Sequence, residues 1–360
     1  MKLPKKGNLS ECGNWRGITL MVVVAKILGR IIINRIKKGV DKKLRKEQAG
    51  FRSGRGTVEQ IFILRNIIEQ AVEWNANLYL CFVDFEKAFD SVHRSTLWKI
   101  LRSYGVPVKL IQIIKALYTR STCAVLDGGG RTDWFEVVSG VRQGCTMSGF
   151  LFLLVVDWVM RKTTAGSNNG IRWKLTETLE DLDYADDIAL LSSTKAQCQR
   201  KVTKLNTIAR ETGLKINVNK TKTMRYNARS EELIRIENNE VEEVNDFTYL
   251  GASVTKEGGA RSEIKVRIRK AWIAFNKLLP IWKNNMYSRN TKIKIFRTNV
   301  LAVALYGSET WGLGKGDERK LDVFLHKCLR RLLRISWKEK VTNDEVREMA
   351  KVPKLSKMVR

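Results

Sequence analysis

The sequence predicts an α+β fold in which a sheet with antiparallel strands carries helices on one face. The continuously apolar segment 78–83 indicates a central strand that is buried on both faces. A helical stretch, a hairpin across 179–191 and a helix around 202–209 follow it along the chain. This strand–helix–hairpin–helix order fits a split βαβ, ferredoxin-like core.

Two segments precede the central strand. The stretch "GNWRGITLMVVVAKILGRIIINRI" begins irregularly and then reads as an apolar helix, or as a strand followed by a helix. The Gly- and Arg-rich stretch "QAGFRSGRGTVEQ" precedes another helix, for which Thr57 and Gln60 offer a capping box. The apolar spacing predicts that this helix buries Val58, Ile61, Phe62, Leu64 and Ile68.

The segment between the central strand and the aspartate hairpin is mostly helical. One helix is expected to stop at Gly105, and the next begins near Val108. The stretch "TCAVLDGGGRTDWFEVV" predicts a hairpin turned by Gly128–Gly130. The apolar run Met147–Met160 predicts a buried helix, and the helix after the aspartate hairpin is expected to stop at Gly213.

The pattern changes from about Val241. The stretch "VNDFTYLGASVTKEGG" predicts a short strand pair, and the chain after Gly259 is helical and basic. We place a domain boundary between Tyr249 and Gly259.

The charge of the chain indicates a polyanionic partner. Its 360 residues carry 66 Lys and Arg against 37 Asp and Glu, a net charge of +29, while 44% of them are hydrophobic, enough for a sizeable core. Each phosphate that a basic side chain neutralises releases counterions, so this excess suits nucleic acid. An anionic membrane surface is the alternative, but the basic residues are spread through periodic helices without an amphipathic anchor.

The cysteine pattern argues against structural zinc. Six cysteines occur without a Cys-x-x-Cys pair, and His93 and His326 are the only histidines. Cys81 and Cys198 read as small core residues, and the usage suits a reducing compartment. No signal peptide is recognised, and the apolar run Phe150–Val156 is too short to span a bilayer. We expect an intracellular protein, nuclear or cytoplasmic.

Adjacent aspartates at the tip of the predicted hairpin are the strongest indication of chemistry. Asp186 and Asp187 lie between two apolar runs, and Asp84 follows the buried strand. Neighbouring central strands can bring the three carboxylates together, where their mutual repulsion calls for a cation of the Mg²⁺ or Mn²⁺ type. Two such ions support phosphoryl transfer without a protein nucleophile. The alternative is a solvated turn, and we interpret Asp90 as a helix or turn cap.

Ordered motifs carry a resemblance to a known family. They run from about Asn14 to Trp337 and include "NWRGITL", "QAGFRSGRGT", "FVDFEKAFDSV", "GVRQGCTMSGFLF", "YADD", "GLKINVNKTK", "FTYLGASV", "YGSETWGL" and "CLRRLLRISW". In this order they resemble the reverse transcriptase domain of non-LTR (LINE-type) retrotransposons. The resemblance implies a right-hand polymerase with partial fingers (1–75), a ferredoxin-like palm (76–258, with fingers elements near 94–145) and a helical basic thumb with a C-terminal region (259–360).

The resemblance implies an RNA-directed DNA polymerase that extends a DNA primer on an RNA template with deoxynucleoside triphosphates. Two Mg²⁺ ions, or Mn²⁺ in their place, would be held by Asp84, Asp186, Asp187 and the carbonyl of Phe85. Lys220 would be the general acid for pyrophosphate, although a lysine in "NKTK" also suits a surface charge.

The resemblance also implies residues that bind substrate. Phe89 would exclude a 2′-hydroxyl, with ordinary apolar packing as the alternative. Arg52 and Arg55 would clamp the triphosphate, with a solvated basic loop as the alternative. Gln143 with Gly144 would contact the nucleotide, or else form only a turn. The primer grip would comprise Tyr249, Leu250 and Gly251. A basic helix face, alternatively only solvated, would track the phosphate backbone through Arg261, Lys265, Arg269 and Lys270.

The match departs from the family in places. Motif B usually has proline where this chain has Gly149, and the fingers sequence and endonuclease that family members carry upstream are expected to be missing, as in a truncated element. A non-catalytic nucleic-acid-binding remnant of a retroelement is therefore the alternative function. A group II intron-type or RNA-copying polymerase is a third reading, against which Phe89 speaks because a bulky ring there blocks a 2′-hydroxyl.

Overall fold

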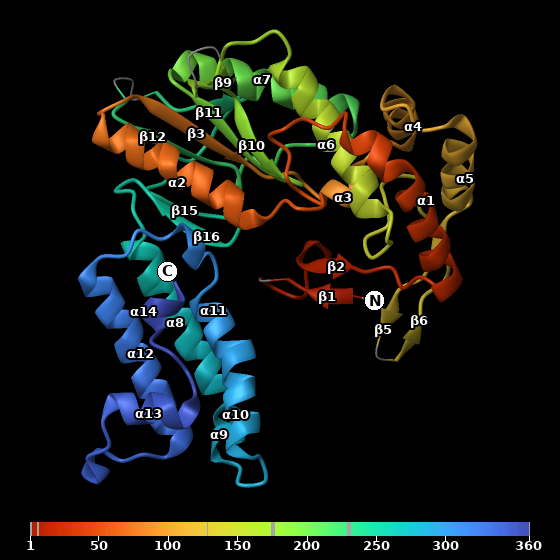
Figure 1. The fold of residues 1–360 in the computed structure, drawn as a ribbon. Coiled ribbons are helices and arrows are strands. Elements are labelled where there is room, and N and C mark those ends of the chain that lie inside the picture. The colour runs from red at the N-terminus through yellow and green to blue at the C-terminus, as the bar shows by residue number, and fades with distance from the viewer. Residues whose placement is uncertain (1, 6, 128, 174–176, 229–231, 360) are drawn as a thin grey trace. The chain divides into compact units, whose positions relative to one another are not determined.

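The computed structural model describes residues 2–5, 7–127, 129–173, 177–228 and 232–359. It forms two compact units (Figure 1). The first comprises Met1–Thr57 with Asn77–Val244, and the second comprises Val58–Ala76 with Asn245–Arg360. The helix after Thr57 thus has its contacts within the second unit. The functional divisions at 75 and 258 stay predictions.

A four-stranded antiparallel sheet is the centre of the first unit. Its spatial order is β10-β11-β3-β12. The strand β3 is buried along its whole length and lies between two neighbours, as the apolar run predicts. Along the chain the four strands alternate with helices as β-α-β-β-α-β, which confirms the ferredoxin-like core. The bounds are Leu78–Val83 (β3), Asp181–Tyr184 (β10), Asp187–Ser192 (β11) and Lys222–Tyr226 (β12).

Helices α6 (Ser148–Thr164) and α7 (Lys195–Glu211) pack together, and α7 contacts β11 and β3 (Figure 1). The apolar run predicted α6 well, since 12 of the 17 residues of this helix are buried. A capping box of Thr194 and Gln197 begins α7, and Gly213 (φ 86°) follows its end as predicted. The other helices of this unit are α1 (Val23–Asp41), α3 (Ala88–Ser91), α4 (Arg94–Ser103) and α5 (Val108–Tyr118).

Short strand pairs complete the first unit. The hairpin predicted around the glycines exists, because Leu126 pairs with Arg131, although Gly128 lies outside the described residues. Cys81 and Cys198 are fully buried core residues, as expected. The pairs are β1 (Lys2–Pro4) with β2 (Trp15–Gly17), β4 (Thr122–Cys123) with β7 (Phe135–Glu136), β5 (Leu126–Asp127) with β6 (Gly130–Arg131), β8 (Ile171–Arg172) with β9 (Thr178–Leu179), and β13 (Arg235–Ile236) with β14 (Asn239–Glu240).

The second unit combines one hairpin with helices around an aromatic core. The predicted strand pair is β15 (Asp246–Tyr249) with β16 (Ala252–Thr255). Phe275 lies at the centre of the core, stacked on Trp282 and edge-on to Phe296. The helices are α2 (Thr57–Glu73), α8 (Arg261–Lys277), α9 (Leu279–Lys283), α10 (Arg289–Ile295), α11 (Ala302–Ala304), α12 (Lys315–Leu333), α13 (Asn343–Ala350) and α14 (Leu355–Met358).

Two of the five residues of α2 that were predicted to be buried are not, because Val58 is half-buried and Phe62 is exposed. Ile61, Leu64 and Ile68 are buried, but the Phe62 side chain is 50% exposed. Successive helical residues are rotated by about 100°, so Phe62 lies beside the buried face and not on it. Within the described part of the chain, no helix is both long and apolar enough to cross a membrane.

Candidate active site

Three aspartates lie at one end of the central sheet. Ile188 of β11 is paired with Val83 of β3, so the next residues along these antiparallel strands, Asp187 and Asp84, lie at the same end. Tyr184 pairs with Asp187, which closes the β10–β11 hairpin and puts Asp186 in its loop. The register therefore places the three aspartates that the sequence singled out at one end of the sheet.

These carboxylates repel one another in a partly desolvated place. Burial, with repulsion from Asp186 and Asp84, raises the pKa of Asp187 to about 6. Burial raises the pKa of Asp84 as well, against the nearby Lys220. Burial also raises the pKa of Asp186, opposed by a backbone hydrogen bond and by Arg16. A cation would relieve this repulsion, so the donor set fits a divalent metal ion.

The side chains of Asp84, Asp186 and Asp187 do not converge on one point. Among the described residues, no three His, Cys, Asp or Glu side chains are close enough together to hold a metal ion. A bound ion would therefore have to draw the aspartates closer, and the fit depends on their chemistry and register, not on a preformed cage.

The segment 215–221 wraps the end of β3. The Asn217 N–H donates to the Asp84 carbonyl at 2.8 Å, and the Asp84 N–H donates to the Thr221 hydroxyl at 3.3 Å. This places the exposed Lys220 ammonium 3.8 Å from an Asp84 carboxylate oxygen. The lysine that the sequence proposed as a proton donor thus lies beside the carboxylates.

Arg16 is a residue near the site that the sequence analysis did not assign. It lies on β2, and its positive charge favours the ionised form of Asp186. The motif "NWRG" contains it, but only the folded chain brings it to an aspartate about 170 positions away.

Of the two aromatic residues after Asp84, Phe85 is part of the core and Phe89 is half-buried against it. Phe85 is buried and forms an isolated antiparallel bridge with Ile216. The ring of Phe89 stacks on that of Phe152, with centroids 4.5 Å apart. This ring contact supports the alternative that Phe89 is an ordinary packing residue. The role of Phe89 in sugar selection stays a prediction.

The two arginines of the "QAGFRSGRGT" stretch differ in how strongly they are hydrogen-bonded within the chain. The Arg52 guanidinium donates to the Asp41 carboxylate at 2.9 Å and to the carbonyls of Arg45 and Gln48. It could bind a triphosphate only by giving up these bonds. Arg55 is exposed and makes one long bond, 3.4 Å, to the Lys46 carbonyl, so it is the better placed of the two.

The Gln143–Gly144 segment forms a close turn. The Thr19 N–H donates to the Gln143 carbonyl at 2.7 Å. Gly144 has φ 102°, and a Cβ there would lie 2.6 Å from the Thr19 carbonyl oxygen, so only glycine fits. The backbone conformation explains the glycine without a ligand, and nucleotide contact by Gln143 stays a prediction.

The predicted primer grip is the turn of the β15–β16 hairpin. Tyr249 is buried, and both Leu250 (φ 48°) and Gly251 (φ 83°) are left-handed. The Tyr306 hydroxyl donates to the Leu250 carbonyl at 2.8 Å, and the Arg267 guanidinium donates to the Gly251 carbonyl. The Arg267 guanidinium also lies 4.4 Å from the centroid of the Tyr306 ring. The turn is therefore held in one conformation by two side chains.

Helix α8 presents basic side chains to solvent. Its tryptophan, Trp272, packs edge-on against Phe275 and Phe324, and so belongs to the core. The Arg261 guanidinium lies 4.0 Å from Asp317, in a weak surface pair. The exposed bases of this helix include the four predicted ones, Arg261, Lys265, Arg269 and Lys270.

Comparison with known proteins decides the family. The pattern described as "Reverse transcriptase (RNA-dependent DNA polymerase)" matches residues 3–254, most of the chain. The chain belongs to the reverse transcriptase family. The right-hand polymerase class predicted for it, with a ferredoxin-like palm, is confirmed on this basis. A domain of unknown function is also matched, over residues 274–306.

The relatives of this chain come from retroelements. It is 24% identical to the "Retrovirus-related Pol polyprotein from type-1 retrotransposable element R2" of Popillia japonica, over 92% of this chain and 47% of that protein. It is 24% identical to the "RNA-directed DNA polymerase from mobile element jockey" of Drosophila melanogaster, over 96% of this chain and 38% of that protein. The chain thus spans about half or less of these curated relatives. They confirm the resemblance to non-LTR retrotransposon polymerases.

Among solved structures, telomerase from Candida albicans is similar, with 11% identity and a TM-score of 0.48 over 90% of this chain and 56% of that one. Reverse transcriptases generally use divalent metal ions, which agrees with the carboxylate chemistry of the site.

Gly149, where the family usually has proline, has a local explanation in this chain. A Cβ at Gly149 would lie 2.9 Å from the ring of Phe51. The ring of Phe51 therefore occupies the space that a side chain at position 149 would need. Phe51 belongs to the same "QAGFRSGRGT" stretch as Arg52, so this stretch lies directly against the start of α6.

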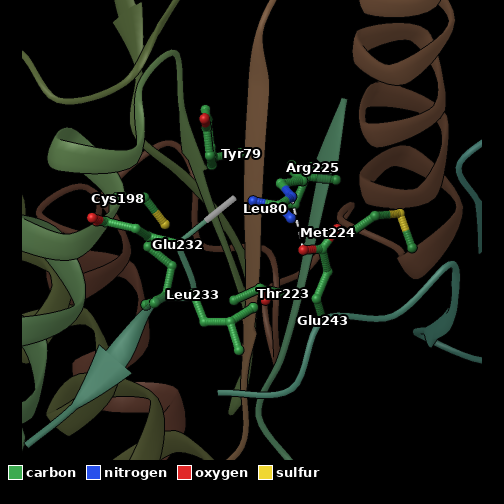
Figure 2. Close-up of a pocket in the computed structure, with 10 residues that line it drawn as sticks. Tyr79, Leu80, Cys198, Thr223, Met224, Arg225, Glu232, Leu233 and Glu243 are labelled. Atoms are coloured by element: carbon green, nitrogen blue, oxygen red, sulfur yellow. Dashed lines mark ion pairs between the residues drawn. The ribbon is translucent and has the colours of Figure 1, made fainter. Parts of the chain in front are cut away.

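A small cavity of the palm lies elsewhere (Figure 2). Tyr79 and Leu80 of β3 line it, together with the paired β12 residues Arg225 and Met224 and with the Arg225–Glu243 ion pair. Because Asp84 follows the opposite end of β3, this cavity is separate from the carboxylates.

Proposed function

We propose that this chain is an RNA-directed DNA polymerase of a non-LTR retrotransposon, which adds deoxynucleotides to a DNA 3′ end on an RNA template. The observation that supports it most is the register that puts Asp84 and Asp187 at the ends of paired strands, with Asp186 in the adjoining loop. In a member of the reverse transcriptase family, that arrangement suits two Mg²⁺ ions, or Mn²⁺.

The aspartates would hold these ions, helped by the carbonyl of Phe85. When bound, the ions would supply activation of the 3′-hydroxyl and neutralisation of the leaving pyrophosphate. Lys220, 3.8 Å from Asp84, would give its proton to the pyrophosphate. Because Lys220 is exposed, the proton can be replaced from water.

Other side chains would recognise the incoming deoxynucleoside triphosphate. Arg55 would bind its phosphates first, and Arg52 only after leaving Asp41. Gln143 and Gly144 would contact the nucleotide through the turn that they form. Phe89 would reject a 2′-hydroxyl, and Phe89→Ala should then raise incorporation of ribonucleotides.

The second unit would bind the primer and the template. The rigid turn at Tyr249, Leu250 and Gly251 would position the primer end. The exposed bases of α8 would follow a phosphate backbone, since such contacts do not depend on sequence. We expect the affinity for an RNA/DNA duplex to fall steeply with salt.

Primer extension on poly(rA)/oligo(dT) with Mg²⁺ tests the function. Wild type should extend the primer, and Asp186→Asn should abolish extension while duplex binding persists, because only the metal ligand is lost. Asp133→Asn, in an exposed loop, is the matched control and should extend normally. Equal extension by wild type and Asp186→Asn would refute the proposal.

A non-catalytic nucleic-acid-binding protein is the second candidate. The net charge of +29, and the lack of a preformed metal cage among the described residues, favour it. It predicts tight, salt-dependent binding of an RNA/DNA duplex by wild type, with no incorporation in Mg²⁺ or Mn²⁺. Incorporation that depends on Asp186 would exclude it.

A further inference from the structure

The loop that carries Asp186 has a conformation that its own residues do not favour. Ala185, the first of its two residues, has φ 58°. Glycine, asparagine or aspartate is usual there, because a Cβ without a polar group gains nothing in the left-handed region. The next two side chains are carboxylates that repel each other. The turn therefore needs support from another part of the chain.

Gln48 provides that support. Its side chain is fully buried. The Ala185 N–H donates to Gln48 Oε1 at 2.8 Å, and Gln48 Nε2 donates to the Ala185 carbonyl at 3.3 Å. The Gly50 N–H donates to the same Oε1 at 2.8 Å, which fixes the side chain of Gln48. One primary amide thus pairs with both backbone groups of Ala185, as a neighbouring strand would.

The backbone around Gln48 lies along the edge of β10. The Ala49 N–H donates to the Asp183 carbonyl at 2.9 Å, and Gln48 forms a parallel bridge with Asp183. A Cβ at Gly50 would lie 2.2 Å from the Ala185 nitrogen, so only glycine permits this approach. Two features therefore allow the contact. One is the buried amide of Gln48, and the other is the absence of a side chain at Gly50.

We propose that Gln48 is the positioning residue of the catalytic turn, which holds Ala185 so that Asp186 and Asp187 stay in register with Asp84. The inference rests on the proposed function, because the turn matters for catalysis only if those aspartates bind the metal ions. Gln48 acts through the turn and touches neither substrate nor metal.

Hydrogen exchange at the Ala185 amide tests the contact directly. Gln48→Met, similar in size but without the amide, should exchange this hydrogen much faster than wild type. Gln48→Glu keeps the acceptor oxygen and should restore most of the protection. Gln60→Met, which removes another buried glutamine, is the control and should leave Ala185 unchanged. Unchanged protection of Ala185 in Gln48→Met would overturn the proposal.

Kinetics test the consequence. In Gln48→Met, kcat for primer extension should fall by about 100-fold, since a small displacement of reacting groups has such an effect. The KM for deoxynucleotide and the Kd for the duplex should stay near wild type, and Gln48→Glu should recover part of kcat. A merely structural role predicts equal losses in binding and turnover. Normal kcat in folded Gln48→Met would contradict the proposal.

The two tests separate the proposal from the polymerase assignment. If wild type does not extend a primer, the proposed function fails, while exchange at Ala185 still decides whether Gln48 holds the turn. If Gln48→Met does not fold, Gln48→Asn replaces it, because its shorter amide cannot reach both groups of Ala185. Wild-type exchange in Gln48→Asn would count against the proposal in the same way.

Discussion

Two turns, one in each unit, are built on the same plan with different partners. Each has a non-glycine residue at positive φ, Ala185 in the aspartate hairpin and Leu250 in the predicted primer grip. Each is held by side chains from distant segments, Gln48 in the first and Tyr306 with Arg267 in the second. Tyr306 and Arg267 donate hydrogen bonds to backbone carbonyls of the second turn. Gln48, in contrast, pairs with both the N–H and the carbonyl of Ala185.

The buried charges behind the two turns have opposite sign. Behind the first, Arg45 donates to Asp181 and Asp183, and its N–H donates to Asp157; all four side chains are buried. Behind the second, Glu263 pairs with Arg267 and also attracts Arg65. Acids exceed bases in the first cluster, and bases exceed the acid in the second.

This difference bears on the charge that each turn presents to a ligand. Below the aspartate hairpin, the buried arginine is already shared among three carboxyls, so it cannot neutralise Asp186 and Asp187. Arg16 acts on Asp186 and Lys220 on Asp84, but no cation among the described residues lowers the pKa of Asp187, so a bound metal ion would relieve the remaining repulsion. The second turn carries no charge of its own, and Arg65 behind it is attracted by Glu69 as well as by Glu263.

The largest expected effect is a loss of stability when the buried cluster of Arg45 with Asp157, Asp181 and Asp183 is broken. Arg45→Met would leave three buried carboxyls without their shared arginine, and should lower the free energy of unfolding by about 3–5 kcal/mol. Urea unfolding followed by circular dichroism measures it. Arg235→Met, which removes an exposed ion pair with Glu240, is the control and should cost under about 1 kcal/mol. Equal losses in the two variants would show that the cluster is not a stabilising unit.

A smaller effect is expected at the second turn. Tyr306→Phe removes the hydroxyl that binds the Leu250 carbonyl, which should lower the stability of this unit by about 0.5–1.5 kcal/mol. It should also raise the KM for primer–template more than it lowers kcat. Tyr287→Phe, at an exposed position of the same unit, should change neither. A wild-type KM in a folded Tyr306→Phe would separate this turn from primer binding.

The smallest effect concerns pH. Burial and repulsion by Asp181 raise the pKa of Asp183 well above its usual range, and its Oδ1 has no hydrogen-bond partner among the described residues. A raised pKa in the folded chain means that the contribution of Asp183 to stability is present at low pH and is lost as pH rises. Asp183→Asn, neutral throughout, should therefore cost less stability at pH 7 than at pH 4. The opposite trend would show that Asp183 is stabilised as a carboxylate.

Features that depend on local pattern could be predicted from the sequence. The apolar run before Asp84 gave a central strand, and the acids at 186 and 187 gave a hairpin tip, because burial and turn chemistry leave periodic signals. The family motifs supplied the candidate residues. The order of the elements along the chain indicated the ferredoxin-like core.

Features that depend on contacts between residues far apart in the sequence could not be predicted from it. Gln48, Arg45 and Arg16 approach the hairpin from segments more than a hundred residues away, and a single sequence has no periodicity that links them. The ion pair of Arg52 with Asp41 was not predicted either, because it forms only in the folded chain. Phe62 was assigned to the core because apolar character alone does not fix the face of a helix.

Iron-directed cleavage tests the central claim, that the three aspartates form the divalent-ion site. With Fe²⁺ replacing Mg²⁺, and with ascorbate and peroxide added, radicals cut the backbone close to the ion. We expect fragments that end near residue 84 and near residues 186–187, suppressed by excess Mg²⁺ and by Asp187→Asn. Cleavage elsewhere, or the same fragments from Asp187→Asn, would contradict the account.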